Sequence, residues 1–408
     1  MKAGDLFMQG PIVAIDVSKG SSHLLSFIEN NKKYGRVFKF DHDVEGFKFL
    51  LQRINQLKEV TGKDVSVVYE ATGVYTGSLT KFLDDQGIKQ YIISPLQSAK
   101  QRNTEIHAKK TDSLDPISIA KTYYALESLR LYEKEGDIYH TLRCLGRNYK
   151  DEQSHLVKYK VTFQNNLEAV FPLFHKIFKD EYSDLALCLL LKYPHPDTIK
   201  NKKPETVAKY LSKHTHHTYN HCLKVAEKAI EVAKNTYPGC DKDDIKVKEL
   251  LRVANRMIDC MNECSELLDE LIQLAKNLPN FEVIKSIPGI GENLAARILA
   301  EIGDVDRYDN AKCLVAYAGL DPHISASGQV DGKHLGITKK GNKNLRTLLY
   351  LAVICSIRQK DDNSIKDFYN KKKQQSVPLK PKAAKVACMN KLLRIIYGMT
   401  TNGTVYQY

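Results

Sequence analysis

Four acidic residues near the start of the chain occupy positions where carboxylates could do chemistry. Asp16 interrupts the apolar run IVAIDVS, Glu70 closes the apolar run VSVVYE, and Asp112 and Asp115 are spaced three apart at an expected helix start. Residues three apart can share one side of a helix. Four carboxylates that converge would repel one another unless hard cations neutralise them. Such cations activate an attacking oxygen and stabilise a leaving oxygen at phosphorus. The set therefore predicts a Mg²⁺ or Mn²⁺ site for phosphodiester chemistry.

Each of these residues also has a simpler interpretation. An aspartate that follows a strand is often a turn residue, and Glu70 alone could be half of an ion pair. The pair Asp112 and Asp115 could cap a helix and complement its dipole. The joint interpretation is favoured because burial of an unpaired carboxylate in an apolar strand, as at Asp16, is costly.

The elements that must position these carboxylates can be read from the hydrophobic pattern. The sequence predicts strands at 12–18, 23–29, 34–41, 64–72 and 88–94, and helices at 44–60 and 77–87. Apolar, β-branched runs of this length indicate buried strands. With the helix at Asp115, the order β-β-β-α-β-α-β-α has an antiparallel start and a parallel finish. This order is typical of an α/β RNase H-like (RuvC-like) domain, and Glu70 would lie at the strand edge where open sheets bind ligands.

Charge indicates a polyanionic partner. The net charge is +13 and the isoelectric point is near 9.1, which suits phosphate-rich partners. The basic residues form three clusters. The first lies just before the acidic pair and contains Lys100, Arg102, Lys109 and Lys110; the second contains Lys339, Lys340, Lys343 and Arg346; the third contains Lys371, Lys372, Lys373, Lys380, Lys382 and Lys385. The nine cysteines form no C-x-x-C pair, so buried thiols are expected. No apolar run approaches 18 residues and no signal-peptide layout is present, so we expect a cytoplasmic protein without membrane contact.

The middle of the chain is expected to be mostly helical. Residues 138–171 form a long segment with spaced apolar residues, which predicts a helical hairpin or a coiled-coil dimer arm. A second amphipathic helix is expected at 266–275.

Two further motifs lie in the C-terminal part. Residues 281–308 have the form of a helix-hairpin-helix with Gly289 and Gly291 at its turn. Glycines there would let the backbone approach a phosphate, while a hairpin that only packs is the alternative. The serine-bearing loop SASGQ, residues 325–329, precedes the basic loop ITKKGNKNLR. By itself Ser327 in this loop indicates nothing, because a nucleophilic serine needs a base or a metal to take its proton.

Taken together, the chain resembles the insertion-sequence one-ten family of transposases, also called DEDD transposases, whose relatives include pilin-gene invertases. The resemblance covers nearly the whole chain. It rests on the segments AIDVSK, YEATGVY, AKKTDSLDP, IPGIGENLAARILAEIGD, LVAYAGLDPHISASGQ, GITKKGNKNLR and KAAKVACMNKLLRIIYGMTTNGTVY.

The resemblance implies three domains. These are a RuvC-like catalytic domain at 1–131, a helical linker and dimerisation region at 132–278, and a C-terminal transposase domain at 279–408. The catalytic D-E-D-D set maps onto Asp16, Glu70, Asp112 and Asp115. The nucleophilic serine maps onto Ser327, with Ser325 as the competing position.

The resemblance also implies partners. They are donor and target DNA, a structured guide RNA from the same element, and further copies of the chain in a homodimer or homotetramer, in the bacterial cytoplasm at the nucleoid. Strand exchange through a phosphoserine link is the expected reaction. The alternatives are a metal-dependent junction-resolving nuclease that hydrolyses with water, and a non-catalytic architectural protein that binds nucleic acid.

Overall fold

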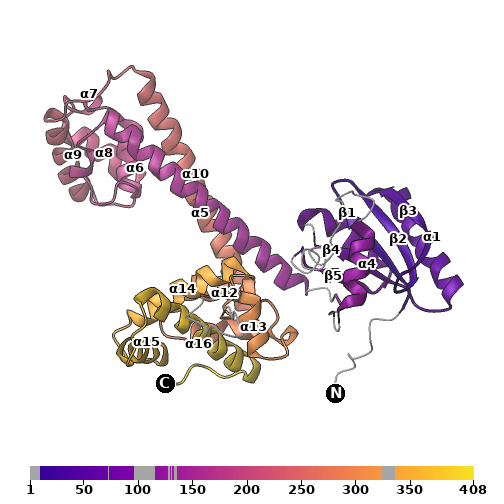
Figure 1. Ribbon diagram of the computed structural model, residues 1–408. Helices are drawn as coiled ribbons and strands as arrows, with labels where there is room; N and C mark the ends of the chain where they lie inside the picture. The colour runs from indigo at the N-terminus through magenta and orange to yellow at the C-terminus, as the bar shows by residue number, and fades with distance from the viewer. Residues whose placement is uncertain are drawn as a thin grey trace. The chain divides into compact units, whose positions relative to one another are not determined.

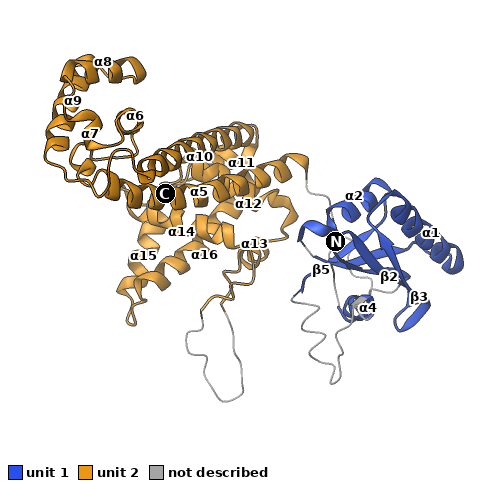
Figure 2. Ribbon diagram, turned by 90° about the horizontal axis from the view of Figure 1, so that it is seen from above, with its two compact units in different colours: residues 1–134 blue, residues 135–408 orange. Residues whose placement is uncertain are grey.

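A computed structural model describes residues 10–71, 73–95, 115–126, 129, 131–132, 136–322 and 336–408, with Asp115 described by its backbone alone. The chain forms two compact units, residues 1–134 and 135–408, shown in blue and orange in Figure 2. Each unit has its own hydrophobic cores. The domain boundaries expected from the resemblance, at 131 and 278, stay predictions.

The first unit is built on a five-stranded sheet with the order β3-β2-β1-β4-β5. β1 pairs antiparallel with β2, and β2 pairs antiparallel with β3, whereas β4 and β5 run parallel to β1. The strands are β1 (Ile12–Val17), β2 (Ser21–Glu29), β3 (Lys32–Asp41), β4 (Ser66–Glu70) and β5 (Gln90–Ile93). The predicted antiparallel start and parallel finish are confirmed, and the arrangement is consistent with an RNase H-like fold.

Helices cover both faces of this sheet (Figure 1). The helical elements are α1 (Val44–Thr61), η1 (Gly73–Thr76), α2 (Gly77–Asp85) and α4 (Asp115–Ala125). Successive strand side chains point to opposite faces. Val13 and Ile15 of β1 therefore pack with α1 and α2, whereas Ile12 and Ala14 pack with α4. The same alternation determines on which face of the sheet the side chain of each polar residue of β1 lies.

The second unit begins with a long helical arm. α5 (Asp137–Val170) has 34 residues and α10 (Ile245–Lys276) has 32, so α5 is about 51 Å long. The two helices pack against each other along the arm (Figure 1). The predicted helix at 138–171 is confirmed. It packs along α10 of the same chain and also contacts α12 (Glu292–Ile302). The helix expected at 266–275 is the last part of a much longer one.

The tip of the arm carries a small helical module. Its elements are η2 (Phe174–Lys176), α6 (Asp184–Lys192), α7 (Pro196–Ile199), α8 (Pro204–His214) and α9 (Tyr219–Lys234). They share one core with the outer half of the arm, including the fully buried Phe163, Phe171 and Phe174.

The base of the arm is embedded in a C-terminal helical bundle. Its elements are α11 (Pro279–Lys285), α12 (Glu292–Ile302), η3 (Val305–Arg307), α13 (Ala311–Ala318), α14 (Lys343–Ile357), α15 (Ser364–Gln374) and α16 (Pro381–Asn402). Leu142 of α5 and Leu271 of α10 belong to the bundle core. At Gly146 the backbone of α5 comes close to α12, because a Cβ at this position would be in ordinary van der Waals contact with the Ala300 Cβ, at 3.6 Å. The arm and the bundle therefore share one core.

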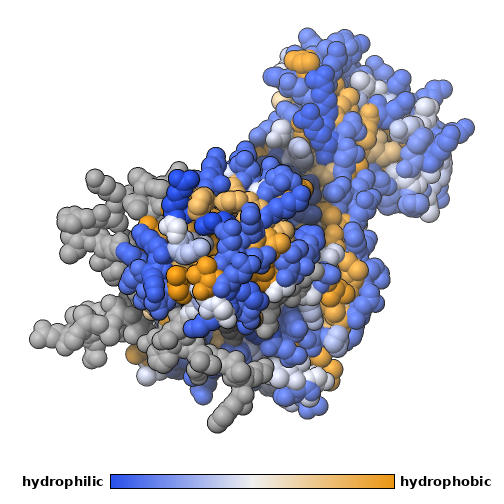
Figure 3. Space-filling model, turned by 90° about the vertical axis from the view of Figure 1, so that its right-hand side faces the viewer, coloured by the Kyte–Doolittle hydropathy of each residue, from blue (hydrophilic) through white to orange (hydrophobic). Residues whose placement is uncertain are grey.

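On the face shown in Figure 3, hydrophilic residues dominate and apolar residues lie in separate patches. Among the described helices, none is both long and apolar enough to span a bilayer.

Candidate metal centre and nucleic-acid interface

Asp16 and Glu70 lie side by side at the carboxyl ends of two neighbouring parallel strands. Ile15 of β1 is in register with Tyr69 of β4, and each acidic residue follows directly. Adjacent strands are about 4.8 Å apart. The alternation of side chains places Asp16 on the face of Ala14 and Glu70 on the face of Val68, which is the same face of the sheet. Both acidic residues are half-buried.

The direction of α4 brings the third acidic position toward this edge. The Tyr124 hydroxyl, near the C-terminal end of α4, donates to the Gly10 carbonyl oxygen at 2.8 Å, just before β1 begins. Ile119 and Ala120 pack on the same sheet face as Ala14. The helix therefore runs opposite to β1, and its first residue, Asp115, lies toward the carboxyl ends of β1 and β4. Asp112 lies outside the described residues.

The donor set fits a hard divalent cation. Carboxylate oxygens are the ligands that Mg²⁺ and Mn²⁺ prefer, and two of them share one face and one edge. Among the side chains that the structure describes, no group of three His, Cys, Asp or Glu residues is close enough to hold a metal. The geometry thus supplies two carboxylates, and the backbone of Asp115 at the start of α4 lies toward the same edge of the sheet.

The sequence interpretation missed His23 beside this site. In the β1–β2 register His23 is paired with Asp16. It lies on the same face, because Leu25 and Phe27 of β2 pack with α4. The His23 Nδ1 atom is buried and has no hydrogen-bond partner among the described residues. The length of the turn at 18–20 sets the register between β1 and β2, so a correct prediction of that turn would have placed His23 opposite Asp16.

The segment that contains Ser325 and Ser327 lies outside the described residues, as do Lys109 and Lys110. The described residues on either side of this segment belong to the second unit. Pro322 and Ile337 form an isolated antiparallel bridge. Thr338 N–H donates to the Asp321 carbonyl oxygen at 2.9 Å, and Lys339 N–H to that of Gly319 at 3.1 Å. The two ends of the segment are thus held together, and the basic turn 339–343 follows at once.

The four basic residues predicted to bind nucleic acid in and after this turn play different roles. Lys339, Lys340 and Lys343 are exposed, and Lys340 and Lys343 line an open cleft. Arg346 instead donates from Nη1 to the Ala318 carbonyl oxygen at 2.8 Å. Its guanidinium therefore holds the end of α13.

The turn between α11 and α12 contains the two glycines predicted to approach a phosphate. Gly289 has a φ of +88°, and a Cβ there would lie 2.5 Å from the Ser356 backbone nitrogen. The Ser356 hydroxyl donates to the Pro288 carbonyl oxygen at 2.7 Å. Packing on α14 therefore accounts for Gly289. Gly291 precedes α12 and has open space around it.

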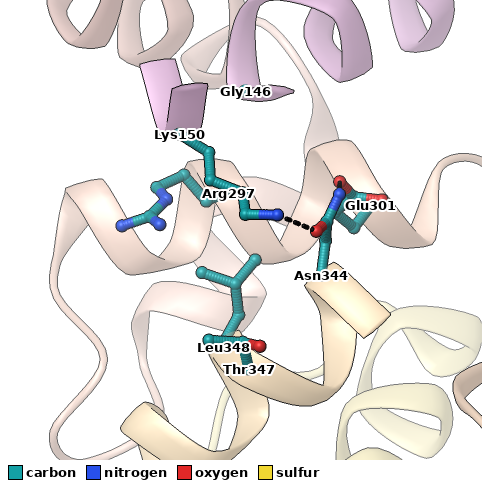
Figure 4. A pocket seen from close by; sticks show the side chains of 7 residues that line it. All are labelled: Gly146, Lys150, Arg297, Glu301, Asn344, Thr347 and Leu348. Carbon is teal, nitrogen blue, oxygen red and sulfur yellow. Dashed lines mark hydrogen bonds between the residues drawn. The ribbon is translucent and has the colours of Figure 1, made fainter. Parts of the chain in front are cut away.

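Glu301 of α12 is a buried carboxylate that the sequence interpretation also missed. It is 5% exposed. Asn342 Nδ2 donates to it at 2.7 Å, and Asn344 Nδ2 donates at 3.0 Å. Arg147 of α5 approaches it at 3.3 Å through Nε. Lys150 Nζ in turn donates to Asn344 Oδ1 at 2.7 Å (Figure 4). One acidic residue within the apolar stretch ILAEIG was the available signal.

The hydrogen bonds decide the ionisation of this carboxyl. Burial raises the pKa of Glu301, but hydrogen bonds from Asn342, Arg147 and Asn344 together outweigh burial and hold the pKa below its ordinary value. Burial lowers the pKa of Arg147, but its hydrogen bond to Glu301 and the attraction of the Glu301 charge, with smaller contributions from other neighbours, together outweigh burial and raise the pKa. Glu301 and Arg147 are therefore both charged at neutral pH.

Comparisons with known proteins match both parts of the chain. A DEDD transposase model of IS110 elements matches residues 13–172, and a model described as the transposase IS116/IS110/IS902 family matches residues 281–370. An uncharacterised 44.8 kDa protein of insertion element IS116 from Streptomyces clavuligerus is 22% identical over 268 residues, 66% of each chain.

Two shorter similarities involve proteins with named activities. The transposase for insertion sequence element IS1111A of Coxiella burnetii is 32% identical over 146 residues, 34% of this chain and 38% of that protein. A pilin gene-inverting protein of Moraxella bovis is 34% identical over 118 residues, 29% and 35% of the two chains. The similar segments thus span just under two thirds of the first of these three proteins and little more than a third of the other two.

Proposed function

Because the chain belongs to the IS110/IS116 family of transposases, we propose that it is the DNA strand-transfer enzyme of an insertion sequence. The observation that carries this proposal is the placement of Asp16 and Glu70 on one face and one edge of the sheet, with α4 starting toward the same edge. Donor and target DNA are its substrates.

The four carboxylates are the ligands of a divalent cation in this proposal. Asp16 and Glu70 would hold Mg²⁺ or Mn²⁺ together with Asp112 and Asp115. When bound, the cation supplies positive charge next to the scissile phosphate. The strands β1 and β4 contribute rigidity, because buried neighbours on both faces fix the positions of Asp16 and Glu70.

The nucleophile in this proposal is Ser327, with Ser325 as the competing position. The serine hydroxyl gives up its proton and its oxygen forms a bond to phosphorus. The bond from phosphorus to one deoxyribose oxygen breaks, and that oxygen takes up a proton and leaves as a hydroxyl group. A hydroxyl of another strand reverses the step and releases the serine. No water is consumed, so the phosphodiester energy is kept for rejoining. The bridge between Pro322 and Ile337 supports the proposal, because it joins the residues on either side of the serine segment directly before a basic turn.

Lys339, Lys340 and Lys343 bind the nucleic-acid backbone in this proposal, together with Lys109, Lys110 and the open backbone at Gly291. By family resemblance, the enzyme also binds a structured guide RNA that selects the site by base pairing, and it works as a homodimer or homotetramer. Base pairing would then carry the sequence specificity, while the protein contacts shape and backbone.

A trapping experiment tests the serine. Wild-type protein, Ser327→Ala and Ser325→Ala are each incubated with labelled DNA and Mg²⁺, denatured, and resolved for a covalent protein–DNA adduct. Loss of the adduct in Ser327→Ala alone is expected. An adduct that survives this change but not Ser325→Ala moves the role to Ser325.

The same assay distinguishes the hydrolytic alternative. A junction-resolving nuclease that uses water would cut DNA in both serine variants, form no adduct, and lose cutting in Asp16→Asn. Strand exchange instead predicts that cutting is lost in Asp16→Asn and in the relevant serine variant.

A further inference from the structure

Glu301 of α12 connects two segments that are far from it in the sequence, α5 and residues 342–344. Its carboxylate accepts hydrogen bonds from Arg147 of α5, from Asn342 just before α14, and from Asn344 in the first turn of α14. Burial of a carboxylate is costly unless several donors satisfy it, and an apolar residue of similar size is often the more stable choice. Fold stability alone therefore gives a weak reason for a charge here.

The network fixes the geometry of the basic turn. Asn342 Nδ2 donates to Glu301, while Asn342 Oδ1 accepts from Leu345 N–H at 3.0 Å and caps α14. Asn342 N–H also donates to the Tyr317 carbonyl oxygen at 2.7 Å. Asn342 Nδ2 also donates to the Tyr317 hydroxyl at 3.1 Å. Several bonds thus hold Asn342, and the exposed Lys340 and Lys343 flank it on either side.

The same network brings α5 to the turn. Arg147 is 51% exposed at its side chain and lines the open cleft together with Lys340 and Lys343. A guanidinium has five N–H donors, so two can face Glu301 while others face the cleft. Three cationic side chains therefore line one cleft, and the buried Glu301 carboxylate accepts hydrogen bonds from Arg147, Asn342 and Asn344, which line the same cleft.

We propose that Glu301 is a positioning residue that holds Arg147 and the Lys340–Lys343 turn as two walls of a cleft for the phosphodiester backbone of a nucleic-acid strand. The inference rests on the proposed function, which supplies nucleic acid as the partner. Glu301 itself does not contact the strand. Its role is to keep cations of α5 and of the turn at a spacing that one backbone can bridge.

The direction in which Glu301→Gln changes the affinity for nucleic acid distinguishes a positioning role from a purely electrostatic effect of the charge. Removal of a carboxylate makes the cleft more positive, so electrostatics alone predicts tighter binding of a polyanion. Positioning predicts weaker binding, because a glutamine amide can accept on one side only and must lose the bond to Asn342 or to Asn344.

A second variant tests whether the hydrogen-bond pattern is what matters. In Glu301→Gln/Asn344→Asp the donor and acceptor exchange places. The new amide at position 301 would donate to the new carboxylate at position 344, which also keeps Lys150 as a donor, and the net charge equals that of the wild type. Asn344→Asp alone puts two carboxylates next to each other and should weaken both folding and binding. The matched control is Glu292→Gln, because Glu292 begins the same helix but pairs with Lys276 at 3.1 Å, away from the cleft.

The experiment measures binding of fluorescent single-stranded DNA, and of RNA of the same sequence, by anisotropy at several salt concentrations, with the full-length chain and melting curves for each variant. We expect Glu301→Gln to bind roughly tenfold more weakly, with a salt slope smaller by about one phosphate contact. We expect the double variant to recover most of the affinity, and Glu292→Gln to match the wild type. If Glu301→Gln weakens the affinity for DNA only, or for RNA only, that nucleic acid is the one that occupies the cleft.

Unchanged or tighter binding by folded Glu301→Gln would overturn the inference, as would a double variant that recovers the melting temperature but not the affinity. The proposed function is tested by different results. Wild-type protein that binds neither DNA nor RNA contradicts the proposed function, whereas the absence of a covalent serine–DNA adduct does not bear on the role of Glu301 in the cleft.

Discussion

Replacement of Gly289 by alanine should destabilise the second unit in the absence of any nucleic acid. The new Cβ would lie 2.5 Å from the Ser356 nitrogen and 2.6 Å from the Cys355 carbonyl carbon, both backbone atoms of α14. Neither atom can move without a shift of the helix. The φ of +88° adds strain for any residue that carries a Cβ.

The magnitude follows from these two contributions. A left-handed backbone costs a non-glycine residue about 1–2 kcal/mol, and overpacking of a dense core costs about 1–3 kcal/mol. A loss of about 3 kcal/mol corresponds to a fall of roughly 6–12 °C in the melting temperature of a domain of 150–250 residues. Calorimetry of the full-length protein without DNA or RNA measures it.

The matched control is Gly291→Ser. It adds a larger side chain two residues away, where a Cβ meets nothing within 4 Å and where serine is a favourable N-cap. This variant should melt at or above the wild-type temperature. The packing explanation would be refuted if Gly289→Ala melted like the wild type while its affinity for DNA fell, because that pattern belongs to a glycine that approaches a phosphate.

Three further predictions follow from the two sites. Asp16→Asn should abolish Mg²⁺-dependent cutting and remove the rise in melting temperature that Mg²⁺ gives the wild type; an equal rise in the variant would contradict the metal assignment. The pKa of Glu301 is lowered by folding, so its network stabilises the protein above about pH 4.3 and loses this contribution on acidification. The difference in unfolding free energy between wild type and Glu301→Gln should therefore shrink from about pH 6 to about pH 3 in urea titrations, and a growing difference would contradict the sign. Arg346→Ala should cost about 1–3 kcal/mol, because the Ala318 carbonyl loses its charged donor, whereas exposed Lys340→Ala should change stability by less than about 0.5 kcal/mol and weaken DNA binding; equal melting of the two variants would refute this division.

Regular hydrophobic patterns made the first unit predictable. The apolar runs around Asp16 and Glu70 identified buried strands, and their order along the chain was sufficient for the mixed sheet. The register that places His23 opposite Asp16 could not be read, because it depends on the turn at 18–20 and not on the apolar pattern.

The second unit was harder to predict because its decisive contacts are between residues distant in sequence. Glu301 is stabilised by residues 154 positions earlier and up to 43 positions later. Local sequence shows one glutamate in an apolar helix, which is compatible with either a surface residue or a buried network. Gly289 was ambiguous for the same reason, since its packing partner, Ser356 of α14, is 67 residues away in the chain.

The chain leaves the bundle along α5 and returns to it along α10. The segment between these helices begins and ends close to the same point, the C-terminal end of α5. Gly239 N–H donates to the Ala169 carbonyl oxygen at 2.9 Å, next to the end of α5. Residues 173–280 also lie between the two segments matched by the family models. The tip is therefore arranged like an inserted module. Its length can change without a change in the paths of α5 and α10, which belong to the bundle core at their base. Any shorter replacement must still cover Phe163 and Leu167, which the tip now shields from water.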